Sequence, residues 1–555
     1  MVSGLPSPAY HTRGLWFAGG RDRTSVVPDH SLTVAETPTA TPRAEFVVRA
    51  PQPSSLRRCA VLLFLSLNFL FMLTSTGRVR TTDEVMTLFE SESLVLRGST
   101  AVPQAVAARL FFGRYDRQGQ PRAAYAPGQA LATTPWYTLG HYALAKVPGV
   151  PENARDLMVG FALTLSSTTF AAAAATFAFL IFCGMGIERR TSLLATLLLT
   201  LATPLFAYSG WFFSESLACA LLLGTALSLF GSNDGIPLRR AALAGALLGF
   251  AVLVRPTHIL LTPIFVIAVV VRERRSGLKP ALAAAMVLGA AVAAYLSYNY
   301  LVFGNPIQFG YPDSAEAGKH VTGFETPLRV GLAGFLFSPG KSIFLFAPPV
   351  LLALWGLPAL WRRDRGLATI ATISLPLALG FYARYTQWEG GYCFGPRYLV
   401  PALVLLSLAL GPVLAETGQS TRAVAVLLFI AGLAVQMLGL ATSFLEAEVG
   451  HHYYNQRFDY RMGYNAPAVQ AELLLKYLSS HEPARIGLGF DRWFVFLHKA
   501  GVGHGTLWAL GLAMAGGAVF STAALVRCVR REDVPAVRLS NPPRLAAPDT
   551  GFAAN

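Results

Sequence analysis

Residues 57–84 read RRCAVLLFLSLNFLFMLTSTGRVRTTDE, and this stretch decides the fold class. Its central run, Cys59 to Thr76, is apolar almost throughout and follows the basic pair Arg57-Arg58. A hydrocarbon core about 30 Å thick is crossed by about 20 apolar residues in a helix. Because basic residues in short segments mark the cytoplasmic side, we interpret this run as a first transmembrane helix that leaves the cytoplasm.

Similar apolar runs recur along the chain almost to Arg527. The composition agrees, since 53% of the residues are hydrophobic and only 14% are charged, against about 25% charged in soluble domains. Lipid offers backbone groups no hydrogen-bond partner, so the spans must be helices or a closed barrel. The runs are too long and continuous for barrel strands, whose residues alternate in polarity. The sequence therefore predicts an all-α polytopic integral membrane protein.

The net charge of +15 does not indicate nucleic acid, because the basic residues lie in short clusters between the apolar runs. The clusters are Arg57-Arg58, Arg189-Arg190, Arg239-Arg240, Arg272 to Arg275, Arg362 to Arg365, and Arg527 to Arg531. Placing these clusters inside gives about twelve crossings of an inner (plasma) membrane, with both termini cytoplasmic. The 5 cysteines are scattered and mostly lie in or beside apolar runs, so no disulfide framework is expected.

The chain divides into a transmembrane domain, residues 57–530, and two terminal tails without apolar periodicity, residues 1–56 and 531–555. Both tails are expected to be disordered in the cytoplasm. Within the domain, Arg255-Pro256 interrupts an apolar run with arginines at both ends. We interpret this run as two short helices with Arg255 at the outer turn; one long tilted span is the alternative.

The outer connections are long, whereas the inner ones are short and basic. They cover about residues 77–156, 299–342, 382–398 and 443–503. In the first of them, residues 127–148 are moderately apolar but contain His141 and Lys146, which favours interfacial helices. This asymmetry predicts a working face on the periplasmic or extracellular side.

The first outer connection begins with the acidic pair Asp83-Glu84. Two adjacent carboxylates just above a membrane can supply a general base or a cation site. The alternative is an ordinary helix start, because Thr82 and Asp83 are good capping residues.

Three more features lie at predicted outer boundaries. The turn Tyr125-Ala-Pro-Gly128 opens the interfacial segment, and the Pro-Gly pair alone would explain it as a turn. Glu215 stands at the top of a span, where an acid usually faces a wet cavity or a partner. Arg255 has the same interpretation.

The loop RYTQWEGGYCFGPRY between two predicted spans combines arginines, an acid, aromatic residues and glycines. Arg384 and Arg397 can clamp a phosphate, while aromatic residues such as Trp388 and Tyr398 can stack on a sugar ring. Glycines let the backbone approach a ligand closely. An aromatic belt with a snorkelling arginine is the alternative, but it requires no Gly-Gly or Gly-Pro-Arg.

Lys341 lies in the segment FSPGKS before another span. The segment lacks the first glycine and the preceding strand of a P-loop, so we reject nucleotide binding; Lys341 remains a candidate for a phosphate head group. His451-His452 is treated as loop, because adjacent histidines point in different directions.

Four features, in their order along the chain, resemble the GT-C superfamily of membrane glycosyltransferases. They are the acidic pair after the first span, Tyr125–Gly128, the Tyr-Ser-x-x-x-x-Ser-Glu boundary (Tyr208–Glu215) and the hairpin sequence GFAVLVRP (Gly249–Pro256). The chain is most similar to bacterial relatives of dolichyl-phosphate-mannose protein mannosyltransferases and of lipid A aminoarabinose transferases. The similarity spans about Cys59 to Pro401.

This resemblance implies a GT-C-like architecture and an inverting transfer from a polyprenyl-phosphate sugar to a hydroxyl of a glycan, lipid or protein. It implies that the acid after the first span is the general base, which is Asp83, with Glu84 as the nearest competitor. The candidates for the donor phosphate are Arg397 first, then Arg384, Arg255 and Lys341. The candidates for the sugar or acceptor are Tyr125, Glu215, Trp388, Glu389 and Tyr398. Family members differ in whether a divalent metal assists, and this sequence does not decide between them.

Two other classes fit parts of the pattern. About twelve spans with both termini inside is also a common layout of secondary transporters, although no half-repeat is evident and most polar residues lie at the outer boundary. A lipid-linked polysaccharide polymerase or ligase would use a large late loop, which residues 443–503 provide. The essential residue distinguishes these readings: Asp83 for the transferase, late arginines and histidines for the polymerase or ligase.

Overall fold

The computed structural model describes residues 53–231, 235–312, 323–391, 393–450, 465–480 and 490–530, all within one compact unit, Ala50–Val534. The predicted tails, apart from residues 53–56, and the pair His451-His452 lie outside the described residues. The described chain is helical nearly throughout, and its strands form one small antiparallel hairpin, β1 (Gly113–Tyr115) and β2 (Pro121–Ala123). The predicted all-α class is therefore confirmed.

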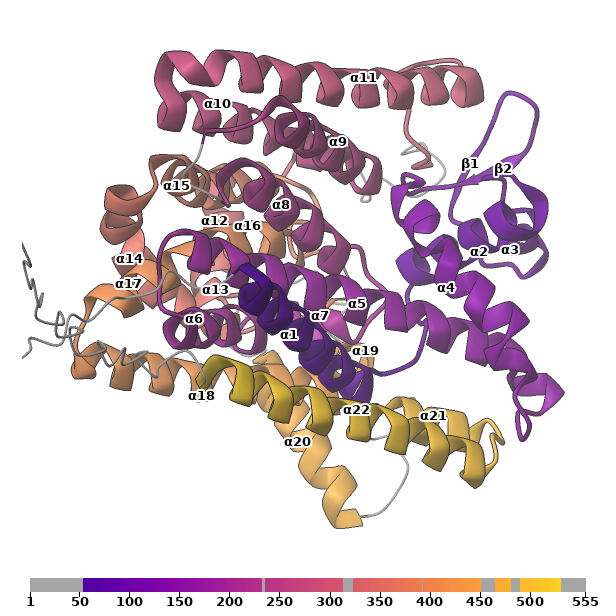
Figure 1. The fold of residues 1–555 in the computed structure, drawn as a ribbon. Helices are drawn as coiled ribbons and strands as arrows, with labels where there is room; N and C mark the ends of the chain where they lie inside the picture. The colour runs from indigo at the N-terminus through magenta and orange to yellow at the C-terminus, as the bar shows by residue number, and fades with distance from the viewer. Residues whose placement is uncertain are drawn as a thin grey trace, which may run out of the picture. The chain divides into compact units, whose positions relative to one another are not determined.

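Long helices form a row through this unit (Figure 1), each packed against the next. The row consists of α11 (Leu278–Phe303), α9 (Leu238–Val254), α8 (Glu215–Phe230), α5 (Arg155–Gly184), α1 (Pro53–Thr74) and α22 (His504–Arg530). Small residues allow the closest approaches: a Cβ on Gly245 would lie 2.3 Å from the carbonyl oxygen of Ala284. Residues far apart in the sequence therefore meet across one continuous core.

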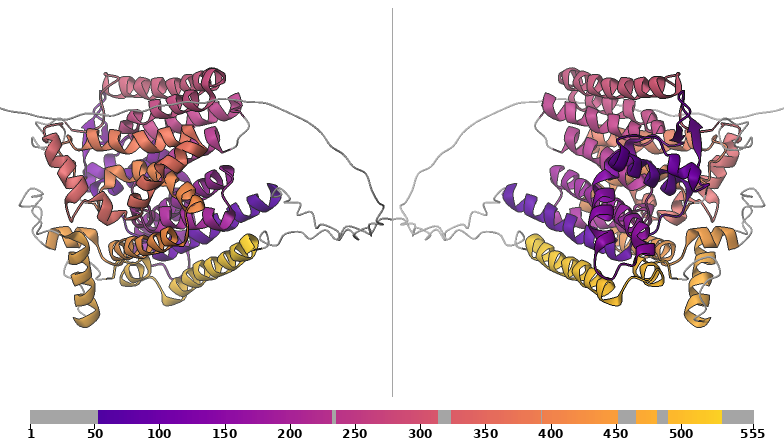
Figure 2. Two further views of the ribbon diagram at one scale, coloured as in Figure 1. Left: turned by 90° about the vertical axis from the view of Figure 1, so that its left-hand side faces the viewer. Right: turned by 90° about the vertical axis from the view of Figure 1, so that its right-hand side faces the viewer.

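A second set of helices packs beside this row (Figure 2). It contains α6 (Arg189–Leu201), α7 (Pro204–Ser209), α10 (Thr262–Glu273), α12 (Leu328–Phe337), α13 (Ile343–Phe346), α14 (Pro349–Arg363), α15 (Arg365–Tyr382), α16 (Val400–Leu406), α17 (Leu410–Glu416) and α18 (Gln419–Ala441). The remaining late helices are α19 (Phe444–Gly450), α20 (Ala466–Ser480) and α21 (Trp493–Lys499). Short 3-10 turns, among them η3 (Pro256–Leu260) and η5 (Arg397–Leu399), connect several of these elements.

The segment after the first span folds beside the right-hand ends of the helices in this row (Figure 1). It contains α2 (Thr82–Arg97), α3 (Pro103–Ala107), the β-hairpin and α4 (Gly128–Tyr142). α2 packs against α4, and α4 packs against α5 and α9. α4 lies in the segment for which interfacial helices were predicted, and it brings the first outer connection over the long helices.

Seven helical segments of the described chain are long and apolar enough to cross a membrane. They are Ser55–Thr74, Glu152–Gly184, Pro256–Phe303, Arg365–Tyr382, Arg397–Glu416, Gln419–Ala441 and His504–Arg530. The other expected spans also form helices but are shorter, as α8, α9 and α14 illustrate. The total of twelve crossings and their direction stay predictions.

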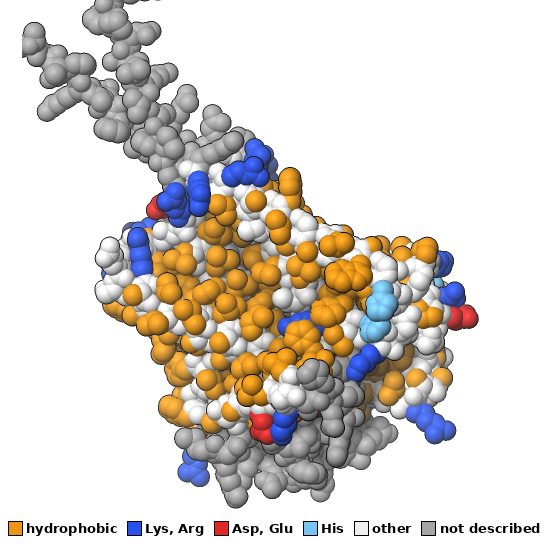
Figure 3. Space-filling view, turned by 90° about the horizontal axis from the view of Figure 1, so that it is seen from below, with side chains coloured by type: hydrophobic (Ala, Val, Ile, Leu, Met, Phe, Trp, Pro, Cys, Tyr) orange, Lys and Arg blue, Asp and Glu red, His pale blue; other side chains and the backbone are white. Residues whose placement is uncertain are grey.

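Exposed apolar side chains cover the face that α18 and α22 present (Figure 3). On α22, Trp508, Leu512 and Phe520 are between 64% and 71% exposed, and on α18, Leu427 is 66% exposed. A soluble protein rarely exposes so continuous an apolar surface. This face is therefore suited to contact lipid.

One expectation about the cysteines is wrong. Cys59 at the start of α1 and Cys528 at the end of α22 form a disulfide, although no disulfide framework was expected. The two residues are separated by 469 positions in the sequence. The packing of α1 on α22 brings them together, and spacing alone gives no sign of it.

Candidate active site

The beginning of α2 positions the acidic pair. Thr81 is the N-cap: its hydroxyl accepts a hydrogen bond from the backbone N–H of Glu84 at 3.4 Å, and Glu84 Oε2 accepts one from the backbone N–H of Thr81 at 2.9 Å. This is a capping box. The acidic pair therefore begins a helix, as the alternative interpretation held, but the capping residue is Thr81 and not Thr82 or Asp83. Glu84 Oε1 also accepts the N–H of Phe212 at 3.1 Å. Both oxygens of Glu84 are thus engaged in local structure.

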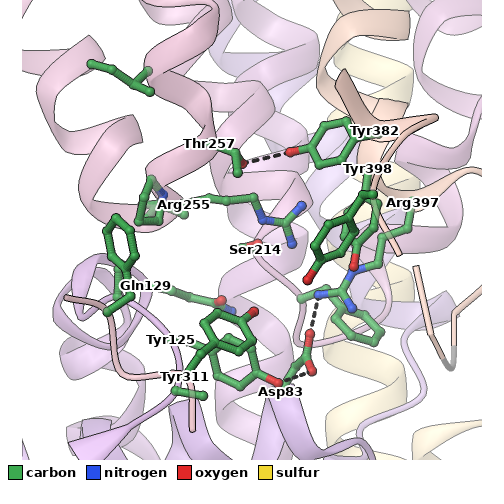
Figure 4. Close-up of a pocket in the computed structure, with 18 of the residues that line it drawn as sticks. Asp83, Tyr125, Gln129, Ser214, Arg255, Thr257, Tyr311, Tyr382, Arg397 and Tyr398 are labelled. Carbon is green, nitrogen blue, oxygen red and sulfur yellow. Dashed lines mark hydrogen bonds and ion pairs between the residues drawn. The ribbon is translucent and has the colours of Figure 1, made fainter. Parts of the chain in front are cut away.

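Asp83, one residue earlier, points away from these contacts and is half-buried. Its Oδ2 lies 2.6 Å from Nη2 of Arg397, and its Oδ1 accepts a hydrogen bond from the hydroxyl of Tyr125 at 2.5 Å (Figure 4). Burial alone would raise the pKa of Asp83. The charge of Arg397 and the hydrogen bonds from Tyr125 and Arg397 outweigh burial and hold this pKa below its usual value. Asp83 is therefore an ionised carboxylate.

Two arginines converge on a single buried carboxylate behind Asp83. Oε1 of Glu215 lies 2.8 Å from Nε of Arg397 and 2.9 Å from Nη2 of Arg255. Oε2 of Glu215 is buried and has no hydrogen-bond partner among the described residues. The guanidinium of Arg397 also lies 4.1 Å from the ring centroid of Phe213. Glu215 therefore fixes the spacing of the two guanidinium groups.

Local sequence explains the backbone conformation at both arginines: Arg255 follows the end of α9, and Arg397 begins η5. Pro256 disfavours helical conformation at the residue before it, so α9 ends at Val254 and Arg255 is extended with φ −149° and ψ 112°. The predicted break at Arg255 is confirmed in this respect. Arg397 follows a tight turn in which Gly395 has φ +62°, and a Cβ on Gly395 would lie 2.6 Å from the ring of Phe346.

Two cavities meet at Asp83. The larger, about 410 Å³, is lined on its polar side by Arg255, Arg397, Gln129, Thr257 and several tyrosines, and on its apolar side by residues such as Ile259, Leu260, Phe309 and Phe324. The smaller, about 210 Å³, reaches Thr81, Thr82, Gln387, Gly390 and Gly391. Both cavities share Asp83, Tyr125, Tyr311, Tyr385, Arg397 and Tyr398. One carboxylate therefore faces two compartments.

Tyrosines form much of the lining of these cavities. The Tyr382 and Tyr398 rings are stacked with centroids 4.7 Å apart, and the Tyr125 and Tyr311 rings meet edge to face at 5.7 Å. The hydroxyl of Tyr382 lies 2.7 Å from Oγ1 of Thr257. Burial and the charge of Asp83 raise the pKa of Tyr125, so Tyr125 stays a proton donor to the carboxylate.

No protein-family model and no curated protein matches this sequence. Among solved structures, the crystal structure of ArnT from Cupriavidus metallidurans bound to undecaprenyl phosphate is similar to this chain. The likeness is one of fold. The alignment has a TM-score of 0.46 at 15% identity and covers 87% of this chain and 77% of that chain.

The structure brings together five of the predicted residues, namely Asp83, Tyr125, Arg255, Arg397 and Tyr398, which all line the larger cavity. Glu215 lies directly behind them. Glu84 is next to Asp83 in sequence but is engaged in the helix cap and by Phe212. The five residues that line the larger cavity come from four separate parts of the chain.

The other predicted residues line neither cavity. Arg384 is exposed. Trp388 is buried with its ring 5.0 Å from that of Phe335. Lys341 is 1% exposed and donates a hydrogen bond to the carbonyl oxygen of Cys393 at 2.9 Å. Glu389 is buried, and burial raises its pKa to about 7, although the charge of Lys341 partly opposes this.

Sequence reasoning missed several residues of the cavity wall, among them Gln129, Thr257, Tyr311, Tyr382 and Tyr385. The repeated tyrosines at predicted outer boundaries were a usable signal for the last three. Gln129 and Thr257 gave none. No group of three or more metal-ligating side chains occurs in the described part of the chain.

Proposed function

We propose that this protein is a membrane glycosyltransferase that moves a sugar from a polyprenyl-phosphate donor to an acceptor hydroxyl, with inversion, at the outer face of the plasma membrane. The observation that carries the proposal is the position of Asp83 at the junction of two cavities, with Arg255 and Arg397 lining the larger one. An inverting displacement requires a base beside the nucleophile and cations beside the leaving phosphate. This site supplies both.

In the proposed complex, the larger cavity holds the donor. Its apolar residues, such as Ile259 and Leu260, suit the first isoprene units, while Arg255 and Arg397 suit the phosphate. The smaller cavity, on the other side of Asp83, holds the acceptor, which is a glycan, a lipid or a protein. The acceptor hydroxyl then lies next to the carboxylate of Asp83.

The proposed reaction is a single displacement. Asp83 accepts the proton of the acceptor hydroxyl while the acceptor oxygen forms a bond to the anomeric carbon. The bond from that carbon to the phosphate oxygen breaks, and its electron pair leaves with polyprenyl phosphate. The charge that develops on the phosphate is stabilised by the two guanidinium groups, which Glu215 holds in place. Tyr125 orients the carboxylate through its hydrogen bond.

The proposal is tested with the protein purified in lipid and supplied with a panel of polyprenyl-phosphate sugars, with and without a chelator. Wild type is expected to transfer or slowly hydrolyse at least one donor. Asp83→Asn is expected to lower the rate by at least about 10²-fold, within the range that a positioned general base contributes. Glu152→Gln is the matched control, because Glu152 is exposed on the surface and forms an ion pair with Arg155.

A result in which Asp83→Asn folds normally and keeps the wild-type rate would place the base elsewhere. No turnover of any donor by wild type would favour a transporter. Loss of activity on chelation would show that a divalent metal takes part.

A further inference from the structure

The turn that carries Arg397 forms part of the lining of both cavities. Gln387, Gly390 and Gly391 line the smaller cavity. Arg397 and Tyr398 line both cavities. Because the proposed function assigns the donor phosphate to Arg397, the position of this turn determines where that phosphate can lie.

Much of the turn has no regular secondary structure. Residues 393–396 belong to neither a helix nor a strand. Cys393 and Phe394 are buried, at 1% and 2% exposure. Buried backbone carbonyl groups are almost always hydrogen-bonded, so those outside helices and sheets need partners from other parts of the chain. Two buried side chains supply partners here.

Lys341 is the first of these side chains. It lies between α12 and α13 and is 1% exposed. Its Nζ donates a hydrogen bond to the carbonyl oxygen of Cys393 at 2.9 Å and lies 3.4 Å from Sγ of the same residue. Burying an ammonium group is costly unless it is hydrogen-bonded. Lys341 therefore holds the turn from behind and does not face the donor.

Tyr208 on α7 is the second of these side chains. It is fully buried, and its hydroxyl donates a hydrogen bond to the carbonyl oxygen of Phe394 at 2.9 Å. The ring of Phe394 lies 4.8 Å from that of Phe346 and 5.6 Å from that of Trp211, measured between centroids. Two successive carbonyl groups before Arg397 are thus each held by a buried side chain.

Close contacts within the turn connect these carbonyl groups to Arg397. Only three residues separate Cys393 from Arg397. The backbone N–H of Arg397 donates a hydrogen bond to the carbonyl oxygen of Gly395 at 3.0 Å. A Cβ on Gly390 would lie 2.8 Å from Sγ of Cys393 and 3.4 Å from Cβ of Arg397. The turn is packed too closely for the Cys393 carbonyl to move without moving Arg397.

We infer that Lys341 and Tyr208 are positioning residues for the transfer, because they hold the turn that places Arg397 at the donor phosphate. This inference rests on the proposed function, in which Arg397 binds that phosphate. Neither side chain lines a cavity, so both act through Arg397.

The test measures the binding of polyprenyl phosphate to the lipid-embedded protein in a double-mutant cycle. Lys341→Met keeps roughly the length of the side chain and removes the ammonium group. It is expected to weaken binding about tenfold, because the guanidinium of Arg397 is no longer held in place. In an Arg397→Gln background, the same substitution should change binding by less than about twofold. An equal loss in both backgrounds would indicate general structural damage and would overturn the inference.

Tyr208→Phe is the second variant, and it decides the question if Lys341→Met does not fold. It removes one hydroxyl group and keeps the ring in the core. Binding of polyprenyl phosphate is expected to weaken about threefold, again only while Arg397 is present. A loss that persists in the Arg397→Gln background, or no loss at all, would contradict the inference.

Arg492→Met is the matched control. Arg492 is also a buried cation, and its Nη1 donates hydrogen bonds to the backbone carbonyl oxygens of Leu440 and Thr74. It lines neither cavity. Its loss should lower the melting temperature and leave the binding of polyprenyl phosphate unchanged. If Arg492→Met weakens binding as much as Lys341→Met does, the loss of any buried cation has this effect and the inference fails.

The failure of this inference can be told from the failure of the proposed function. If wild type binds no polyprenyl phosphate, the proposed function itself fails. If wild type binds it and both variants bind it equally well, only the inference about Lys341 and Tyr208 fails.

Discussion

Both carboxylate oxygens of Asp83 are already bound before any substrate arrives, one by Arg397 and one by Tyr125. These contacts affect how a donor phosphate can bind. The ion pair with Arg397 at 2.6 Å and the hydrogen bond from Tyr125 lower the basicity of Asp83. In the proposed reaction, Arg397 must turn from Asp83 to the donor phosphate, which frees the carboxylate to accept a proton. Asp83 and the phosphate thus compete for one guanidinium group.

This competition predicts an unusual mutational effect. Asp83→Asn is expected to bind polyprenyl phosphate about tenfold more tightly than wild type, because Arg397 no longer has to leave a carboxylate. In an Arg397→Gln background the same substitution should have a much smaller effect. A double-mutant cycle of binding constants measures the difference. Equal tightening in both backgrounds would indicate simple charge repulsion and contradict the exchange of Arg397.

Glu90 gives a prediction for stability against pH. Burial raises its pKa to about 8 from 4.5. The folded protein therefore keeps a proton that the unfolded chain releases, and stability falls as the pH rises from about 4.5 to about 8. Glu90→Gln has no proton to lose, so its melting temperature at pH 8 should exceed that of wild type by about 3 °C. The difference should shrink at pH 5; a constant difference would contradict this explanation.

At the residue scale, sequence reasoning chose Asp83 with Glu84 as its competitor, and of these two acids Asp83 lines the cavities. The side chains of two adjacent acids at the start of a helix point in different directions. Only the cap contacts, which engage Glu84, show that Asp83 is the acid that is left for the cavity. The loop before Arg397 shows the same limitation. Trp388 and Glu389 have suitable chemistry, but the turn directs them into the protein, whereas Tyr398 faces the cavity. The amino-acid composition of a loop can indicate that it binds a ligand. Which of its side chains face that ligand depends on the folded path of the backbone.

At the element scale, the first turn of α2 is the part on which the catalytic proposal depends. The capping box of Thr81 and Glu84 fixes the turn that carries Asp83. Thr81→Ala removes the cap and is expected to cost about 1 kcal/mol of stability. Because fraying of this turn also displaces Asp83, transfer activity should fall more than the stability loss alone explains.

Thr82→Ala is the matched comparison for this prediction. Thr82 is exposed, caps nothing, and lies in the helix, where alanine is a favourable residue. Its melting temperature should equal or slightly exceed that of wild type. If Thr81→Ala and Thr82→Ala lower the melting temperature equally, the cap has no special role in stabilising α2.

Element boundaries were more predictable than element partners. The break at Arg255-Pro256 follows from proline chemistry alone, and the helices before and after it were expected from the apolar runs. The pairing of α1 with α22, and with it the Cys59–Cys528 disulfide, joins residues 469 positions apart. Nothing in local periodicity indicates which apolar helices become neighbours, because most of them have similar faces.

At the scale of the whole molecule, the proposed function requires that the site open to the outer face of the membrane. If the basic clusters of the short connections lie inside, as the sequence predicts, the junction of α17 and α18 is expected on the inner side of the membrane and the β-hairpin on the outer side. Figure 1 shows these two parts at opposite ends of the helical bundle. Gln118 beside the hairpin and Gly418 between α17 and α18 are both exposed, so each tolerates a reporter cysteine.

In intact cells, a membrane-impermeant maleimide is expected to label Gln118→Cys and not Gly418→Cys. After the membrane is permeabilised, both variants should react, and the parent protein shows the background of its own cysteines. The opposite labelling pattern would show that the chain has the reverse orientation in the membrane, because the two ends of the bundle lie on opposite sides. Asp83, which lies at the same end as the hairpin, would then face the cytoplasm, and transfer at the outer face would be contradicted even if the purified protein turned over a polyprenyl-phosphate sugar.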